Sequence, residues 1–261
     1  MLRIVRRGDR HDPRDLTVSV RFEGQFESAF EAGRAEGLLP GETVKNLVHA
    51  TARQHGADEI ERLGIALCER VLSGRPQITR ARVEIAEQPW GRVEVGGKAQ
   101  GQAFYAGPPE RRTAMITSNG SQLAVVSGIE NLTLMRTAGF APRHRSDDGA
   151  DDGLQRLLVA TLGARWTYTS GDVTFAVYRQ GIRSAIVETF AAHARQSVQH
   201  TLFSIADVVL ANYQDIADVT LALHERPYRP ADLFAAGVEN PDDLFVAAEE
   251  PVGVVEVTVE R

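Results

Sequence analysis

Acidic, hydroxyl and imidazole side chains stand close together at several places in this sequence. Two of these places hold Glu42 and Thr43, with His49 shortly after, and His224 with Glu225. Two carboxylates brought close together shift each other's pKa values apart, which is one way to obtain an acid and a base in one site. In a simpler interpretation, Glu42 only supports the first turn of a helix through the helix dipole, and His224 is a surface residue.

An arginine and a glutamine have the right chemistry to hold a flat polar molecule. The Arg156 guanidinium can pair with a carbonyl and an anionic ring nitrogen, whereas the Gln199 amide supplies one donor and one acceptor. However, an arginine in a strand more often forms a surface ion pair, and a glutamine at a helix start is often a cap. The residue types alone therefore leave both interpretations open.

The elements that must position these side chains follow from hydrophobic periodicity. Alternation of apolar and polar residues predicts strands at 2–5, 16–22, 81–85, 102–105, 112–117, 122–126, 132–135, 157–168, 219–223 and 252–259. Apolar stripes predict a helix that starts at Pro40-Gly41-Glu42-Thr43, and further helices at about 58–72, 175–191 and 197–210. The polar stretch 143–153 is the least structured segment of the sequence.

The second half of the sequence repeats the first at an offset of about 138 residues. The offset holds without a gap through a helix, a turn and a strand end. It pairs Leu67 with Ile205, Val71 with Val209, Ile78 with Ile216, Val83 with Leu221, Glu87 with Glu225, Pro89 with Pro227 and Trp90 with Tyr228. We therefore predict an α+β protein of two ββααββ units, at 1–126 and 127–261. Each unit would form an antiparallel sheet with helices on one face, and its open sheet edges favour closure by assembly with other subunits.

Composition excludes several classes of protein. The net charge of -6 and the pI near 5.7 argue against a nucleic-acid-binding protein, which usually carries a basic stripe. A single cysteine, Cys68, rules out an intrachain disulfide and a cysteine-based zinc site, and no metal site is predicted. No apolar run approaches the roughly 20 residues that span a membrane. We expect a cytoplasmic protein that interacts with neither nucleic acid nor membrane.

Several short motifs, taken in their order and spacing, resemble the urate oxidase (uricase) family of the tunnelling fold (T-fold). The resemblance covers nearly the whole chain. The motifs are LTVSV at 16–20, FEG at 22–24, VKN at 44–46, TRARVEI at 79–85 leading to Pro89-Trp90, GPPERRT at 107–113, SGI at 127–129, ARW at 164–166, SVQ at 197–199, and the segment from Asn240-Pro241 to Glu250-Pro251.

The resemblance implies a homotetramer whose subunits close barrels around a tunnel, with active sites at subunit interfaces. It implies an enzyme that needs no cofactor, uses dioxygen as co-substrate and binds a flat purine-like heterocycle. Arg156 and Gln199 stand where the family grips the pyrimidine edge of urate, with Val198 beside the glutamine. Phe140 is the candidate for the aromatic residue that stacks on the ring.

The catalytic residues of the family do not carry over to this sequence. The family uses a lysine-threonine pair as proton relay, a histidine behind it, and an asparagine that helps to hold dioxygen or water. Gly41 stands at the position of the threonine, Glu225 at that of the asparagine and Pro227 at that of the histidine, while His224 replaces a proline. The lysine belongs to a segment before the first strand, so that either the start is trimmed or the lysine is absent.

These replacements leave three hypotheses. Urate oxidation without a cofactor needs a relay that removes and returns protons, and neither glycine nor proline has a side chain that can do so. The first hypothesis is a diverged oxidase or monooxygenase in which Glu42, Thr43, His224 and Glu225 form an altered acid-base set, with Glu42 and Glu225 from different subunits. The second is a true urate oxidase with an altered relay. The third is a catalytically silent binding or structural subunit that pairs with an active paralogue.

Overall fold

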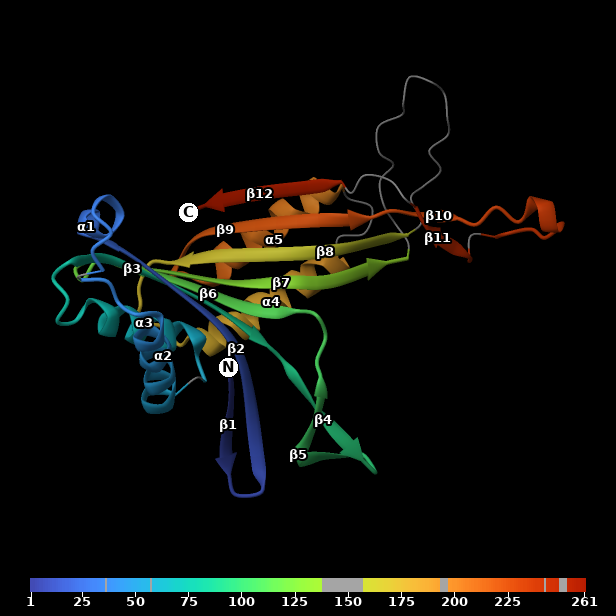
Figure 1. Ribbon diagram of the computed structural model, residues 1–261. Coiled ribbons are helices and arrows are strands. Elements are labelled where there is room, and N and C mark those ends of the chain that lie inside the picture. Colours follow the sequence, from blue (N-terminus) through green and yellow to red (C-terminus); the bar gives the residue numbers. More distant parts are fainter. Residues whose placement is uncertain (36, 57, 138–156, 193–196, 242, 249–252) are drawn as a thin grey trace. The chain divides into compact units, whose positions relative to one another are not determined.

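The computed structural model describes the chain except residues 36, 57, 138–156, 193–196, 242 and 249–252 (Figure 1). By their contacts, the residues form two compact units. Unit 1 consists of Met1–Gly128 with Trp166–Arg179, and unit 2 consists of Ile129–Arg165 with Gln180–Arg261. These units are defined by contact, whereas the predicted copies 1–126 and 127–261 are defined by sequence repetition and stay a prediction.

Unit 1 is an antiparallel sheet that carries helices. Its strands follow one another across the sheet as β1 (Leu2–Arg7), β2 (Arg10–Gly24), β3 (Ile78–Gln88), β6 (Arg111–Ser118) and the first part of β7 (Leu123–Arg136). The helices of the unit are α1 (Glu27–Glu31), α2 (Gly41–His55) and α3 (Ile60–Leu72). Helix α3 packs on β3 and β6, and α2 packs on α3. A separate hairpin is formed by β4 (Trp90–Val95) and β5 (Lys98–Ala106) (Figure 1).

The core of unit 1 lies between α3 and the sheet. Apolar residues of α3 recur at helical spacing, which gives the helix one apolar face, and those of the strands alternate. These residues are almost completely buried: Ile60, Leu63, Leu67 and Val71 on the helix, and Val83, Ile85 and Ile116 on the strands. Gly64 permits the close approach, since a Cβ at this position would lie 2.3 Å from Cδ1 of Ile116.

Unit 2 repeats this arrangement with its own strands and helices. The rest of β7 is followed across the sheet by most of β8 (Leu158–Tyr168), by β9 (Ile216–Arg226) and by β12 (Val254–Glu260). Helix α5 (Val198–Asn212) packs on β9 and β12, and most of α4 (Phe175–Ala192) also belongs to this unit. A further segment holds β10 (Tyr228–Pro230), the 3-10 turn η1 (Phe234–Ala236) and β11 (Phe245–Ala247), and we call it the β10–β11 arm.

The predicted fold class is confirmed, since both units combine an antiparallel sheet with helices. The strands predicted at 122–126 and 132–135 are one continuous strand, β7, in which Asn131 has a positive φ of 60°. The prediction missed β4, β10, β11 and α1. It placed a strand end at Pro89-Trp90, where β4 in fact begins, because short exposed strands carry little hydrophobic alternation. In the part of the chain that the structure describes, no helix is long and apolar enough to cross a membrane.

Candidate functional site

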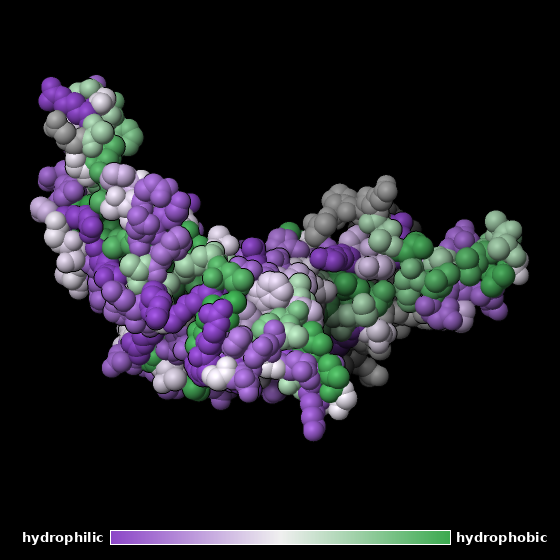
Figure 2. Space-filling view, turned by 60° about the horizontal axis from the view of Figure 1, so that its bottom comes forward, coloured by the Kyte–Doolittle hydropathy of each residue, from purple (hydrophilic) through white to green (hydrophobic). Residues whose placement is uncertain are grey.

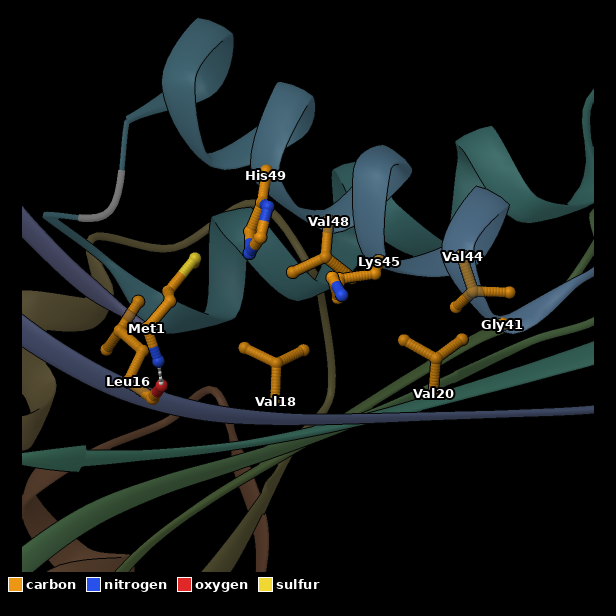
Figure 3. Close-up of a pocket in the computed structure, with 9 residues that line it drawn as sticks. All are labelled: Met1, Leu16, Val18, Val20, Gly41, Val44, Lys45, Val48 and His49. Atoms are coloured by element: carbon orange, nitrogen blue, oxygen red, sulfur yellow. Dashed lines mark hydrogen bonds between the residues drawn. The ribbon is translucent and has the colours of Figure 1, made fainter.

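A cavity of about 270 Å³ lies between α2 and β2 in unit 1 (Figure 3). The strand contributes three apolar side chains as a floor, while the helix contributes both apolar and titratable side chains. The lining residues are Leu16, Val18 and Val20 on β2, Gly41, Val44, Lys45, Val48 and His49 on α2, and Met1. The amino group of Met1 donates a hydrogen bond to the Leu16 carbonyl.

The two periodicities of the sequence explain how this cavity forms. Helix α2 begins at Gly41, directly after Pro40, whose ψ of 141° belongs to extended chain. From Gly41 onward, the positions three to four residues apart share one face of the helix, which brings Lys45 and His49 to the side of Gly41. On β2, every second side chain points to the same face of the sheet, so that Val18 shares the floor with its neighbours two residues away.

The predicted residues Glu42 and Thr43 lie in the first turn of α2, beside this cavity rather than in its lining. Both side chains are exposed. The Glu42 carboxylate forms an ion pair with Lys45, with 2.8 Å between Oε1 and Nζ. Glu42 is therefore connected to the cavity through its ion pair with Lys45, a lining residue that the sequence analysis did not single out.

His224 and Glu225 lie at the end of β9 in unit 2. His224 is exposed, whereas Glu225 is 7% exposed and follows the buried Leu221 and Leu223 in the strand alternation. Successive side chains of a strand point to opposite faces of the sheet. His224 and Glu225 thus face opposite sides of β9, so that the two side chains do not converge on one side of the sheet.

Val198 and Gln199 lie in the first turn of α5, also in unit 2. Val198 is half-buried and Gln199 is exposed. The cap of this helix is Ser197, whose Oγ accepts a hydrogen bond from the backbone N–H of His200 at 3.2 Å. The capping role that was one interpretation of Gln199 therefore belongs to Ser197. The other two predicted binding residues, Phe140 and Arg156, lie outside the described residues.

Unit 1 also contains a buried polar cluster that sequence analysis missed. Glu61, on α3, is completely buried, and its Oε1 accepts a 2.6 Å hydrogen bond from Ser127. Its Oε2 lies 3.8 Å from Nη1 of Arg179. Burial raises the pKa of Glu61, while the hydrogen bond from Ser127 and the charge of Arg179 act in the opposite direction. Among the described residues, Glu61 Oε2, Arg179 Nη1, Trp166 Nε1 and the Tyr168 hydroxyl have no hydrogen-bond partner.

The repeat gave a signal that could have drawn attention to this cluster. The offset of 138 residues pairs Glu61 with Gln199, and each is the second residue of its helix, α3 or α5. At this equivalent position unit 1 has a buried carboxylate and unit 2 an exposed amide. The offset also relates Glu87 of unit 1 to Glu225 of unit 2, and both side chains are buried. Oε1 of Glu87 forms an ion pair with Nη1 of Arg14 at 2.7 Å.

The described residues contain no group of three or more His, Cys, Asp or Glu side chains that could hold a metal ion. The one cysteine, Cys68, is buried in unit 1, and burial raises the pKa of its thiol to about 12. A thiol in this state is a poor nucleophile, because the thiolate is the reactive form. The chemistry of the cavity therefore rests on Lys45, His49 and the nearby Glu42.

Comparison with known proteins shows similarity along nearly the whole chain. The sequence model of the family described as "Uricase" matches residues 3–117 and 125–256. The chain is 28% identical to the uricase of Arthrobacter globiformis over 265 residues, which cover 100% of this chain and 86% of that protein. It is 27% identical to the uricase of Danio rerio over 270 residues, which cover 100% of this chain and 91% of that protein.

Solved structures show the same similarity. The crystal structure of the uricase from Arthrobacter globiformis superposes with a TM-score of 0.88 at 28% identity and covers 100% of this chain and 90% of that one. A uricase from Bacillus fastidious superposes with a TM-score of 0.80 over 95% of this chain and 82% of that one. At 18% identity, the second likeness supports the fold alone.

Proposed function

This chain belongs to the uricase family, and on that premise we propose that it is a cofactor-independent oxidase that acts on a urate-like planar heterocycle with dioxygen. The observation that carries this proposal is the cavity between α2 and β2. Its floor of Leu16, Val18 and Val20 is apolar, and titratable side chains stand along its helical wall. Small-molecule sites have this composition, with apolar walls and a few polar groups that fix orientation.

The size of the cavity agrees with a small ligand. Its volume of about 270 Å³ is close to the lower end of the range of about 300–1,000 Å³ that is typical of ligand pockets. The position agrees as well, because Gly41 lines the cavity and stands where the resemblance places the relay threonine. The missing threonine side chain leaves this end of the cavity without a hydroxyl, so that protons must move through other groups.

The proposed reaction transfers two electrons from the ring to dioxygen. A general base first removes a ring N–H proton, because an electron-rich ring anion gives electrons to dioxygen more readily than a neutral ring. Dioxygen takes up two electrons and two protons and leaves as hydrogen peroxide. Water then adds its hydroxide to the oxidised ring. For urate, the sum is urate, dioxygen and water going to 5-hydroxyisourate and hydrogen peroxide.

The polar edge of the heterocycle would be held by residues of a second subunit, as the family resemblance implies. We propose that Arg156 and Gln199 pair with this edge, that Val198 contacts it, and that Phe140 stacks on the ring. The exposed position of Gln199 in the first turn of α5, with Ser197 as the cap, supports its part in this proposal. A homotetramer would bring these residues to the cavity of a neighbouring chain, and a paralogue could do the same in a hetero-oligomer.

Glu225 and His224 take the place of family residues near the oxygen site. A carboxyl group at the position of the family's asparagine changes the chemistry that is available there. The main proposal is accordingly a urate-like ring rather than urate itself. A true urate oxidase is the second candidate, and the 28% identity to the Arthrobacter globiformis uricase across the whole of this chain favours it.

A direct experiment separates these candidates. Purified protein is mixed in air with urate, and then with a panel of purines and pterins, while the ultraviolet absorbance of the ring, oxygen uptake and peroxide are recorded. Loss of the urate band together with peroxide supports the true urate oxidase, whereas turnover of another ring supports the main proposal. Ligand-induced thermal stabilisation without turnover would identify a silent binding subunit instead.

A matched pair of variants tests the binding residues. We expect Arg156→Ala to abolish stabilisation by the ring that binds the wild-type protein, because the guanidinium fork would be lost. Arg165→Ala removes an exposed arginine of β8 and is the control, which should bind as the wild type does. Equal binding by both variants would contradict the proposed role of Arg156.

A further inference from the structure

We propose that His49 accepts and returns the ring proton in the α2–β2 cavity and that the Lys45 ammonium holds the resulting anion. This inference rests on the proposed function, and it names groups that can move the proton where Gly41 stands in place of the family's relay threonine. It is carried by the placement of the two side chains on one face of α2, above an apolar floor.

The composition of the cavity lining narrows the choice of a proton acceptor. Of the nine lining residues, Lys45 and His49 carry the titratable side chains. The β2 side chains that face them are Leu16, Val18 and Val20, which cannot take up a proton. The Met1 amino group is already engaged with the Leu16 carbonyl. A ring in this cavity would therefore find its proton acceptor on α2.

The spacing of the two residues suits a joint task. Lys45 and His49 are four residues apart, and residues at this spacing are neighbours on a helix surface. In Figure 3, the imidazole of His49 extends from α2 toward β2, on the side of Met1, and the Lys45 side chain is drawn one turn away, beside Val48. A flat ring between helix and strand could thus contact both side chains at once.

The chemistry of the His49 and Lys45 side chains suits them to different roles. An imidazole can accept and return a proton near neutral pH, which makes histidine the commonest general acid and base. An ammonium is a compact positive charge with three donors and no acceptor, so it stabilises an anion rather than taking up its proton. His49 is therefore assigned to the proton transfer and Lys45 to the charge.

Before a ligand binds, the Lys45 ammonium is paired with the Glu42 carboxylate. The ion pair between the two has 2.8 Å between Oε1 and Nζ, and the Lys45 and Glu42 side chains are 58% and 77% exposed. Exposed ion pairs contribute little to stability, because water competes for both charges. An anionic ring can thus take the place of the Glu42 carboxylate at Lys45 without a large penalty.

The proton balance of the proposed step is closed. The ring N–H bond breaks and an imidazole N–H bond forms, so that the ring gains one negative charge beside the Lys45 ammonium. After dioxygen has taken two electrons from the ring, water adds its hydroxide to the oxidised ring and releases a proton. The reduced dioxygen takes up this proton and the proton of the His49 imidazolium, so that His49 returns to its neutral form and hydrogen peroxide leaves.

The test compares His49→Gln with His55→Gln. His55 is the last residue of the same helix, is exposed and does not line the cavity. We expect His49→Gln to lower kcat by about 10²–10⁴-fold, the usual contribution of a positioned acid or base, with little change in KM. The pH dependence of kcat should differ from that of the wild type in this variant, because a glutamine amide neither takes up nor releases a proton. His55→Gln should keep both kcat and the pH profile.

A second comparison tests Lys45 without turnover. We expect Lys45→Gln to weaken the binding of xanthine, as a purine probe, measured by thermal stabilisation, whereas Lys98→Gln on β5 should leave it unchanged. Thermal melting in the absence of ligand checks that each variant is folded. The inference is overturned if His49→Gln keeps the wild-type kcat and pH profile, or if Lys45→Gln binds xanthine as the wild type does. Absence of both turnover and binding in the wild type is a different result, which rejects the proposed function itself.

Discussion

Ser127 donates a 2.6 Å hydrogen bond to Oε1 of Glu61, a carboxyl group that is completely buried in unit 1. The same carboxyl lies 3.8 Å from Arg179 through its Oε2. Glu61, on α3, thus contacts Ser127 of β7 and Arg179 of α4, and its charge state depends on both contacts. Two predictions follow from this arrangement.

The first prediction concerns the pH dependence of stability. Burial raises the pKa of Glu61 in the folded state above its unfolded value, so the folded state binds the proton more tightly. The stabilisation of the folded state by this tighter proton binding is fully present below the unfolded-state pKa of Glu61, and it is lost as the pH rises through the folded-state pKa of Glu61. Glu61→Gln has no such proton. We therefore expect the wild type to lose stability relative to Glu61→Gln as the pH rises.

Thermal or urea unfolding of both proteins from about pH 4 upward, around the ordinary glutamate pKa of about 4.3, measures this difference. The change with pH is the relevant quantity, because replacing the carboxyl group by an amide also adds an offset that does not depend on pH. A difference that is flat across the pH range, or that changes in the opposite sense, would contradict the prediction.

The second prediction concerns Ser127→Ala. This change removes a hydrogen bond to a buried carboxyl group and leaves Oε1 without that donor. We expect the free energy of unfolding to fall by about 1–3 kcal/mol, as is typical when a buried polar group loses its partner. Ser28→Ala on the exposed face of α1 is the control and should stay within about 0.5 kcal/mol of the wild type. Urea unfolding at neutral pH compares the three proteins.

The third prediction restores a hydroxyl at the cavity. Apart from its chain neighbours and the nearby backbone of α2, no described heavy atom lies within 4 Å of a Cβ built at Gly41, so that the Cβ of a side chain there would point into open space. If the chain oxidises a heterocycle, we expect Gly41→Thr to raise kcat, because the hydroxyl can pass a proton along the cavity wall. Gly41→Val has the same shape without the hydroxyl and is the control. An equal kcat in both variants would show that the hydroxyl has no part in proton transfer.

The fourth prediction concerns assembly through the β10–β11 arm. Large apolar side chains on this segment are exposed, and Figure 2 shows hydrophobic surface along it at the right of the view. They are Phe234 at 90%, Val238 at 55%, Leu244 at 49% and Val246 at 52% exposure. Apolar surface gathered in this way is typical of protein interfaces.

We expect Phe234→Ser to shift the protein toward smaller assemblies in analytical ultracentrifugation, because the most exposed aromatic side chain of the arm would be lost. Phe30→Ser removes an aromatic side chain that is 84% exposed on α1, outside the arm, and is the control. If the second variant changes the assembly as much as the first, the effect does not arise from the arm.

Much of the fold could be predicted from the sequence. Periodicity of 3.6 and 2.0 residues reflects local backbone geometry, and it was sufficient to place α2 at Gly41 and to put Val18 on the floor-forming face of β2. The sequence analysis placed His224 and Glu225 in one acid-base set, whereas in β9 the two side chains face opposite sides of the strand. The sequence left Gln199 either as a helix cap or as a binding residue. In the structure the cap is Ser197, which removes the first interpretation.

The cavity and the buried charges were decided by tertiary structure. Periodicity tells which residues share a face, but not which other segment covers that face, so that Lys45 became a lining residue only when α2 was placed over β2. From the sequence alone, Glu61 looks like an ordinary polar residue in the first turn of a helix. It is buried because Ser127 and Arg179, both distant in the sequence, are brought against it. The energy of a charge depends on its surroundings in space, and those surroundings are set by the packing of the whole unit.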